Sequence, residues 1–308
     1  MRNMRAMTYS EYGEPQNLEL HDVPTPKVAP SAVLIRVERA AVNPVDWKLL
    51  SGAMDPMMDT VFPVTPGWDV AGVIEKVGPD VPEFSPGDRV AAYARKDFLH
   101  GGTYAEYVSV PATSVAHVPD AVDVDTAAGL PLAGLTALRS LETIDVSGDD
   151  TVLIHAASGG VGHLAAQLAV DSGASVIGTA SEANHERLRE LGVQPVAYGD
   201  GLEDRVKELA PEGVTAVLDF VGDVRNQTLA VLADGGRHIS TADASVEEKG
   251  GHWVWVRPDG ARLRSLLEKV EQRRLTVDID TTYSLDRATE AMQHNQRGSR
   301  GKILIDVT

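Results

Sequence analysis

Apolar runs of strand length alternate with helical patterns through the middle of the chain. Each run is bounded by glycine or polar residues, and the runs cover 151–155, 175–178, 194–198, 215–221, 237–240 and 252–256. Apolar residues recur at helical spacing between them, most clearly over 182–191, 201–210 and 224–233. Strands that alternate with helices in this way predict an α/β fold with a doubly wound parallel sheet.

The chain before this region has a different pattern. Prolines and glycines separate short strand-like runs at 33–38, 70–77, 88–91 and 105–110. This pattern is typical of a strand-rich, partly coiled domain. A helical passage near 125–142 then leads into the alternating region.

The end of the chain does not continue the alternation. Two helical stretches, 261–274 and 286–294, precede an apolar run at 302–307. We therefore expect the C-terminal residues to return to the first domain. The expected domains are 1–117 together with 263–308, and 118–262.

A glycine-rich turn follows the run at 151–155 and precedes a helix rich in small residues. Its pattern is Ala157-x-Gly159-x-x-Gly162, one glycine short of the usual dinucleotide fingerprint. A helix N-terminus has unpaired N–H groups and a partial positive charge, so it attracts a pyrophosphate. Gly162 would let the helix pack closely against the strand. We interpret the turn as a nucleotide site, with a plain strand-to-helix turn as the alternative. The expected cofactor contacts are Ser158, Gly159, Gly160 and Val161.

The end of the second strand indicates which nucleotide binds. An NAD site usually has an acid about 20 residues beyond the glycines, which holds the ribose hydroxyls. Here that segment is Thr179-Ala180-Ser181, without an acid. Because an acid there would repel a 2′-phosphate, its absence, with Ser181, Asn184 and Arg187 nearby, predicts NADPH. Glu182 would favour NADH, but we expect it to face solvent at a helix N-terminus.

Composition narrows the classes of function. The net charge of −17 disfavours nucleic acid and anionic membranes as partners. No apolar stretch reaches the about 18 residues of a transmembrane helix. The chain has no cysteine, which excludes disulfides, cysteine nucleophiles and thiolate metal sites. The N-terminus lacks the apolar stretch of a signal peptide, so we expect a cytoplasmic protein. The acidic surface also resembles that of salt-adapted proteins, although an arginine-rich genome would give a similar composition.

Further motifs occur in order along almost the whole chain. They are Ala41-Val-Asn-Pro-Val-Asp-Trp-Lys48, Pro66-Gly-Trp-Asp-Val-Ala-Gly-Val-Ile74, Phe84-Ser-Pro-Gly-Asp-Arg-Val90, Gly101-Gly-Thr-Tyr-Ala-Glu-Tyr107, Leu130-Pro-Leu-Ala-Gly-Leu-Thr-Ala137 and Arg300-Gly-Lys-Ile-Leu304. With the glycine turn, they resemble the medium-chain dehydrogenase/reductase superfamily and its zinc-free quinone oxidoreductase branch. The resemblance implies a GroES-like catalytic domain joined to a Rossmann domain, with the active site between them.

The resemblance also bears on metal chemistry. Zinc-dependent alcohol dehydrogenases of the superfamily use a Cys and a His of the first domain, and Asn43 and Trp68 stand in the corresponding places. Neither is a usual zinc ligand. Without a Lewis acid, alcohol oxidation loses the stabilisation of its alkoxide. We therefore expect no catalytic metal. We expect the reaction to be hydride transfer from NADPH to a quinone or related electron-poor carbonyl acceptor. The alternatives are reduction of an alkenal or enoyl double bond, or nucleotide binding without turnover.

The resemblance assigns three further roles. Asn43 resembles an asparagine beside the nicotinamide, a catalytic residue whose amide could contact the cofactor's ribose or the substrate; Thr136 resembles a threonine that reaches the nicotinamide; and Tyr198 resembles a tyrosine near the adenosine phosphate. Arg300 could bind the pyrophosphate, because its guanidinium is a fork of donors. Each of these residues also has an ordinary alternative. Asn43 would be a turn residue before Pro44, and Thr136 a helix residue whose hydroxyl bonds its own backbone. Tyr198 would pack at the end of a strand, and Arg300 would pair with a surface acid.

The acceptor pocket is expected around Trp47 and Trp68, since such sites use aromatic walls. Core packing is the alternative for both. Lys48 lies where some relatives carry a tyrosine, and a buried lysine there could donate a proton as a catalytic residue. A solvated surface lysine is the alternative, with water as the proton donor. The loops at 50–62 and 92–102, which would shape the pocket, have no readable pattern.

The run at 252–256 contains Trp253-Val-Trp-Val256 and has high β-propensity. We expect it to form an exposed or edge strand. An uncovered edge of this kind pairs readily with a second copy, which predicts a homodimer.

Overall fold

The computed structural model describes residues 3–308, which form two compact units. Unit 1 contains the chain up to Leu132 together with Arg257–Thr308, and unit 2 contains Ala133–Val256. The sequence pattern placed the boundaries at 117/118 and 262/263 instead.

Two helices explain the different boundaries. Helix α2 (Val124–Gly129) packs against strands β3 (Ala32–Val42) and β5 (Asp69–Val77) of unit 1. Helix α8 (Gly260–Glu271) packs against β9 (Val115–His117) of the same unit. Helical periodicity identifies these helices, but it does not say which sheet their apolar faces cover.

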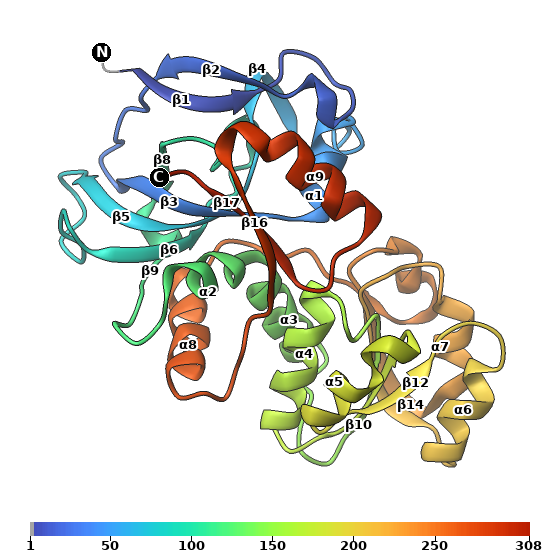
Figure 1. Cartoon of the computed structure of the whole chain (residues 1–308). Helices are drawn as coiled ribbons and strands as arrows, with labels where there is room; N and C mark the ends of the chain where they lie inside the picture. Colours follow the sequence, from blue (N-terminus) through green and yellow to red (C-terminus); the bar gives the residue numbers. More distant parts are fainter. Residues whose placement is uncertain (1–2) are drawn as a thin grey trace. The chain divides into compact units, whose positions relative to one another are not determined.

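Unit 1 is built on a largely antiparallel sheet (Figure 1). Its strand order is β16-β17-β3-β5-β6-β9, with β8 also paired to β3. The other strands are β16 (Ile279–Ser284), β17 (Lys302–Asp306), β6 (Arg89–Tyr93) and β8 (Tyr107–Pro111). Strand β17 is antiparallel to β3, as expected of a chain that returns to its first domain.

Short elements complete unit 1. Strand β1 (Asn3–Thr8) pairs with β2 (Glu19–Pro24), and β4 (Asp59–Thr65) pairs with β7 (Phe98–Gly101). Helix α1 (Pro44–Leu50) begins just after β3, because the proline ring sets the backbone of the first helical turn. Helix α9 (Ala288–Arg297) packs against α1 and β17. Single 3₁₀ turns lie at Pro15–Asn17, Ala112–Ser114 and Leu285–Arg287.

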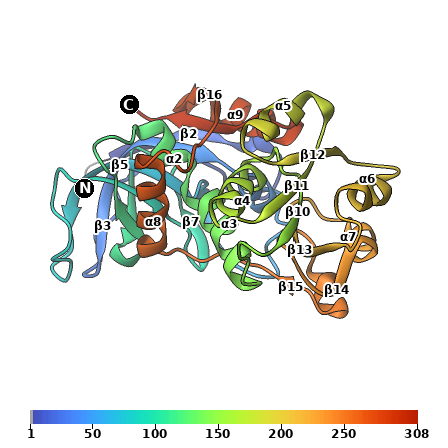
Figure 2. The ribbon, with the colours of Figure 1, turned by 90° about the horizontal axis from the view of Figure 1, so that it is seen from below.

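Unit 2 is a parallel sheet with helices on both faces (Figure 2). Its order is β12-β11-β10-β13-β14-β15, which is 3-2-1-4-5-6 along the chain and confirms the predicted doubly wound class. The strands are β10 (Thr151–His155), β11 (Ser175–Ala180), β12 (Gln194–Ala197), β13 (Val214–Asp219), β14 (Leu232–Ser240) and β15 (His252–Trp253). The helices are α3 (Pro131–Thr143, entering from unit 1), α4 (Gly160–Asp171), α5 (His185–Glu190), α6 (Leu202–Leu209) and α7 (Arg225–Val231), with 3₁₀ turns at Glu182–Asn184 and Ala244–Lys249.

Two strands of unit 2 differ from the sequence pattern. Strand β14 starts at Leu232, before the predicted run at 237–240, and has a register shift opposite Val214 and Ala216. Strand β15 ends at Trp253, although the pattern predicted a strand over 252–256. Trp253 and Trp255 are partly buried, with ring centroids 6.0 Å apart.

Within residues 3–308, no helix combines the length and apolarity needed to cross a bilayer.

Candidate active site

The glycine turn of unit 2 is held by the strand beside it. The backbone N–H of Ala156 donates to Thr179 Oγ1 at 3.0 Å, and that of Ala157 donates to Thr179 O at 3.0 Å. Ala156 adopts a left-handed conformation (φ 57°), which turns the chain sharply out of β10. No sequence pattern indicated that Thr179, buried at the end of β11, would hold this turn.

Gly162 lies where a side chain would not fit. A Cβ atom at this position would lie 2.2 Å from Ala156 O and 2.9 Å from Ala157 Cα. Helix α4 therefore approaches the turn after β10 closely, although the contact is with this turn and not with the strand itself. Gly159, at the N-cap of α4, differs: its Cβ would meet only Ala156 O, at 3.3 Å, and its φ is −76°.

This pair of glycines gives a matched test. Gly162→Ala is expected to lower the free energy of unfolding by about 1–3 kcal/mol, because the methyl group forces backbone apart. Gly159→Ala should change it by less than about 0.5 kcal/mol, yet weaken dinucleotide binding because its methyl group obstructs the approach of a pyrophosphate. Urea unfolding and NADPH fluorescence titrations measure the two effects. Wild-type stability in Gly162→Ala would contradict the packing argument.

The residues predicted to recognise the cofactor lie at one edge of the sheet. Ser181 follows β11, and Asn184 Nδ2 donates to its Oγ at 3.1 Å. Arg187 Nη2 lies 3.4 Å from Nδ1 of His163, in the first turn of α4. Tyr198 is 64% exposed and follows Ala197, which pairs with Ala180 across the strands. Because the carboxyl ends of parallel strands share one edge, these side chains lie on the side of the sheet that carries the glycine turn. Glu182 is exposed, as expected.

The remaining predicted cofactor contacts have mixed surroundings. Ser158 and Val161 are half-buried and Gly160 is exposed at the start of α4. Thr136 is buried in α3, and its carbonyl accepts a hydrogen bond from Ser140 Oγ at 2.8 Å. Arg300 is exposed in unit 1, before β17, and its backbone N–H donates to Asp280 Oδ2 at 2.9 Å. Its predicted contact with a pyrophosphate stays a prediction.

Two buried polar residues lie where the strand order of unit 2 reverses. His155 ends β10 opposite Asp219, which ends β13. Burial lowers the pKa of His155 to about 4, and its Nε2 lies 3.1 Å from Thr228 Oγ1. Asp219 accepts hydrogen bonds from the N–H groups of Val221 and Gly222. Ligands bind at this switch point in open α/β sheets.

Unit 1 contains a buried polar network around Asn43. Asn43 Nδ2 donates to Asp69 Oδ2 at 2.9 Å, and Lys302 Nζ donates to Asn43 Oδ1 at 2.5 Å. The Lys302 ammonium is also 3.6 Å from Asp69 Oδ2. Asp46 Oδ2 accepts from the Asn43 backbone N–H at 2.8 Å and from Tyr104 Oη at 3.0 Å. Both ends of the Asn43 amide therefore have partners inside unit 1.

Burial shifts the pKa values of the ionisable groups in this network. It raises the pKa of Asp46 to about 7, although hydrogen bonds from Asn43 and Tyr104 lower it. Burial also raises the pKa of Asp69, which Lys302 counteracts. For Lys302, burial lowers the pKa and the two carboxylates oppose this. Sequence reasoning missed Asp46, Asp69 and Lys302, although all three lie inside the motifs that carried the resemblance.

The three side chains predicted for the acceptor side lie in different surroundings. Trp47 Nε1 donates to Asn295 Oδ1 of α9 at 3.1 Å, so this indole holds two helices together. Lys48 is half-buried on α1, with Nζ 5.6 Å from the centroid of the Trp47 ring. Trp68 is 6% exposed, packs edge-on against Tyr93 and lines a pocket.

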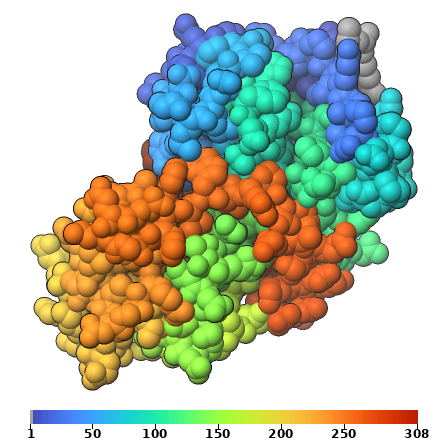
Figure 3. All heavy atoms as spheres, turned by 180° about the vertical axis from the view of Figure 1, so that it is seen from behind, coloured from blue at the N-terminus to red at the C-terminus, as the bar shows by residue number. Residues whose placement is uncertain are grey.

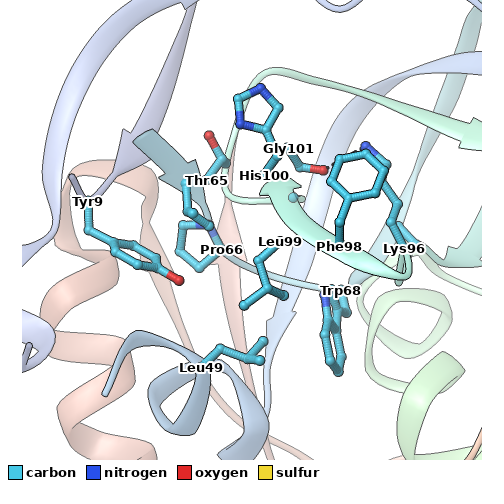
Figure 4. A pocket seen from close by; sticks show the side chains of 13 residues that line it. Tyr9, Leu49, Thr65, Pro66, Trp68, Lys96, Phe98, Leu99, His100 and Gly101 are labelled. Atoms are coloured by element: carbon cyan, nitrogen blue, oxygen red, sulfur yellow. Dashed lines mark hydrogen bonds between the residues drawn. The ribbon is translucent and has the colours of Figure 1, made fainter. Parts of the chain in front are cut away.

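That pocket lies between β4, β7 and the chain around Trp68 (Figure 4). Its cavity volume of about 20 Å³ has room for one water molecule. The Tyr9 hydroxyl points inward from one end, while Trp68, Lys96 and Phe98 lie at the other (Figure 4). Tyr9 is 1% exposed, and its Oη has no hydrogen-bond partner within residues 3–308. Lys96 Nζ donates to Gly101 O at 2.9 Å, and burial lowers its pKa. Tyr9 and Lys96 are site residues that the sequence pattern did not reveal.

Comparison with known proteins adds family information. The profile described as "Alcohol dehydrogenase GroES-like domain" matches residues 29–120, and that described as "Zinc-binding dehydrogenase" matches 160–249. These matches confirm the predicted GroES-like and Rossmann fold classes. The chain is 38% identical to "Chloroplast envelope quinone oxidoreductase homolog" of Arabidopsis thaliana, over 98% of both chains. It is 32% identical to "NADPH-dependent alkenal/one oxidoreductase, chloroplastic" of the same plant, over 99% of this chain and 80% of the relative. The quinone oxidoreductase of Coxiella burnetii has a TM-score of 0.90 and 33% identity, over 100% of both chains.

Proposed function

Because the chain belongs to the medium-chain dehydrogenase/reductase superfamily and its quinone oxidoreductase branch, we propose that it is a zinc-independent, NADPH-dependent reductase of quinones or related electron-poor carbonyl compounds. NAD(P)H-dependent oxidoreductase activity is common to the group. The choice of NADPH, the acceptor class and zinc independence are the proposed parts.

The polar network around Asn43 is the observation that carries zinc independence. In the family's zinc enzymes a Cys and a His occupy the places of Asn43 and Trp68. Here the amide of Asn43 is hydrogen-bonded at both ends, and the indole of Trp68 is no zinc donor. The Lys302 ammonium already lies 3.6 Å from Asp69 and supplies the positive charge in this region. These donors do not fit a zinc ion, and no step of the reaction is assigned to one.

The residues of unit 2 fit a phosphorylated dinucleotide. The N-terminus of α4 offers N–H groups to a pyrophosphate, and Gly159 leaves the approach free of a side chain. Ser181, Asn184 and Arg187 would hold the 2′-phosphate, since no acid lies at the end of β11. When bound, NADPH supplies the hydride. The protein contributes mainly positioning.

The acceptor side is assigned to the region of unit 1 around Trp68. The enclosed cavity there holds about one water molecule, so the acceptor itself would lie outside that cavity. Reduction of a quinone carbonyl or an enone creates an oxyanion that hydrogen-bond donors can stabilise and a proton must neutralise. Tyr9 Oη and Lys96 Nζ are donors at this pocket. Lys48, predicted for this role, is half-buried and lies outside the residues that line the pocket.

A second candidate is reduction of a carbon–carbon double bond conjugated to a carbonyl. The similarity to the alkenal/one oxidoreductase favours it. It differs from quinone reduction in requiring a proton at the α-carbon. Product analysis after turnover of an enone distinguishes saturation of the double bond from formation of an allylic alcohol.

The experiment is NADPH consumption with a panel of quinones, enones and aldehydes, with and without a chelator. We expect turnover of quinones or enones that the chelator leaves unchanged. We also expect kcat/KM to favour NADPH over NADH by about tenfold or more, the effect of a charge-assisted contact to the 2′-phosphate. Activity lost on chelation would refute zinc independence, and equal efficiency with both cofactors would refute the NADPH assignment.

The homodimer stays a proposal based on an edge strand. Strand β15 pairs with β14 on one side, and it ends the strand order of the parallel sheet. A second copy could extend the sheet there. Light scattering at micromolar concentration should give the mass of a dimer, and a monomer would exclude it. The cytoplasmic location also stays a prediction, and both Arabidopsis relatives carry names of chloroplast proteins.

A further inference from the structure

Unit 1 has a second, much larger hollow beside the Trp68 pocket. Its volume is about 720 Å³, within the range of small-molecule sites. The groove is formed by the chain before β3, the segment between β6 and β7, strand β8 with the turn after it, and the residues that lead into α8. Helix α8 lies on the surface of this unit, in orange-red in Figure 3. We refer to this hollow as the basic groove.

The charge of the groove is opposite to that of the chain. Its lining contains the cations Lys27, Arg95, Lys96 and Arg257, and one acid, Asp97. The chain as a whole has 45 acidic and 28 basic residues. Asp97 is 93% exposed on its side chain and lies 3.4 Å from Arg95 Nη1, so it neutralises only part of this charge. A local excess of positive charge on an acidic protein attracts an anion to that place.

Two of these cations, Arg95 and Lys96, are partly buried. The Arg95 side chain is 13% exposed, and its Nε is buried without a hydrogen-bond acceptor within the described part of the chain. Lys96 is half-buried and anchored to Gly101 O. The hydroxyl-bearing residues Ser109, Thr113 and Ser114 line the same groove. Arginine with nearby hydroxyls is a donor set suited to carboxylate or phosphate oxygens.

The groove and the Trp68 pocket share residues. Lys96 and Phe98 line both, and Phe98 is 47% exposed, which offers an apolar surface between them. We propose that the basic groove binds a carboxylate or phosphate group of the acceptor, whose apolar, reducible part lies against Phe98 toward Trp68. The identity of the ligand as the acceptor rests on the proposed function; the anion site itself does not.

An equilibrium experiment tests the anion site without turnover. Calorimetric titrations of the cofactor-free protein use 2-naphthoate, 1-naphthyl phosphate and the neutral 2-naphthalenemethanol. The test variant is Lys27→Gln/Arg257→Gln, because both residues are exposed and line the groove. The control is Lys76→Gln/Lys207→Gln, which removes the same charge from exposed positions outside it.

We expect the anions to bind more tightly than the neutral alcohol. Anion affinity should fall roughly tenfold in the groove variant, as expected for the loss of two exposed charge contacts, and should stay within about twofold of wild type in the control. The anion that binds more tightly shows whether the site prefers a carboxylate or a phosphate. Equal binding of the neutral compound, or equal losses in both variants, would overturn the site.

A kinetic experiment tests the link to the acceptor. With NADPH, kcat/KM is measured for 1,2-naphthoquinone and for its 4-sulfonate, and their ratio cancels differences common to both variants. The sulfonate/neutral ratio should fall roughly tenfold in the groove variant and stay unchanged in the control. An unchanged ratio in the groove variant would overturn the assignment to the acceptor. If neither quinone is reduced, the proposed function fails, and the titrations still decide the anion site.

Discussion

Replacing Lys302 by methionine is expected to lower the free energy of unfolding of unit 1 by about 3–5 kcal/mol. The ammonium is 3.6 Å from Asp69 and donates to Asn43 at 2.5 Å, in a region where Asp69 is fully buried. Methionine fills much the same space but leaves the carboxylate without its counter-charge. An uncompensated buried charge is among the most destabilising changes a single substitution makes.

A double variant separates charge from packing. In Lys302→Met/Asp69→Asn, the Asn43 amide can turn over and accept from the new amide, while the backbone N–H of Leu132 keeps its oxygen partner. We expect most of the lost stability to return. The exposed Lys76→Met serves as control and should change stability by less than about 0.5 kcal/mol. A double variant no more stable than Lys302→Met would show that packing, and not charge, dominates.

Unit 1 needs its own spectroscopic probe for these measurements. The tryptophans of the chain are Trp47 and Trp68 in unit 1, and Trp253 and Trp255 in unit 2. In a Trp253→Phe/Trp255→Phe background, tryptophan emission reports the unfolding of unit 1 in urea. Free energies then refer to one unit instead of a two-unit average.

Asp46→Asn is expected to change how stability depends on pH. The folded-state pKa of Asp46 is about 7, above its ordinary value of 3.8, because burial disfavours the charged form. Folding therefore takes up a proton between these values, so the contribution of Asp46 is full below pH 3.8 and is lost as pH rises through 7. At 1.36 kcal/mol per pH unit, the loss is about 4 kcal/mol.

The amide has no such dependence. Asparagine keeps an oxygen for the Asn43 N–H and the Tyr104 hydroxyl but does not ionise. The free energy of unfolding of the variant relative to wild type should rise by about 4 kcal/mol between pH 4 and pH 7.5. Urea unfolding in the Trp253→Phe/Trp255→Phe background measures it. The control is Asp123→Asn at the N-cap of α2. There burial raises the pKa, but hydrogen bonds from Thr126 outweigh it and leave the pKa lowered. The control difference should stay flat above pH 4, and a flat difference for Asp46→Asn would refute the assignment.

The sequence predicted those parts of the structure that depend on neighbours in the chain. Strand–helix alternation predicted the parallel sheet, and the spacing of Gly159 and Gly162 predicted the close turn. The start of β14 was missed because Asp234, Gly235 and Gly236 have low β-propensity, and before Arg237 only Leu232 pairs with β13, across a register shift.

The polar network depends on residues far apart in the chain. Lys302 and Asn43 are 259 positions apart and meet because β17 pairs with β3. Tyr9 reaches the Trp68 pocket by the antiparallel bridge it forms with Val64. Neither contact leaves a local pattern. The family resemblance indicated Asn43 and Trp68 as site residues, but it could not show that the Asn43 amide is hydrogen-bonded to Asp69 at one end and to Lys302 at the other.

The position of β17 in the chain sets an order of events during synthesis. Unit 2 is continuous and ends at Val256, so its sheet is complete before β17 has been translated. The sheet of unit 1 cannot be completed until β17 has been synthesised. Until then Asp69 lacks Lys302 as its counter-ion, and the edge of β3 that pairs with β17 is unpaired. On the ribosome unit 2, the middle of the chain, therefore matures first, and unit 1 is the one exposed to chaperones and to misassembly.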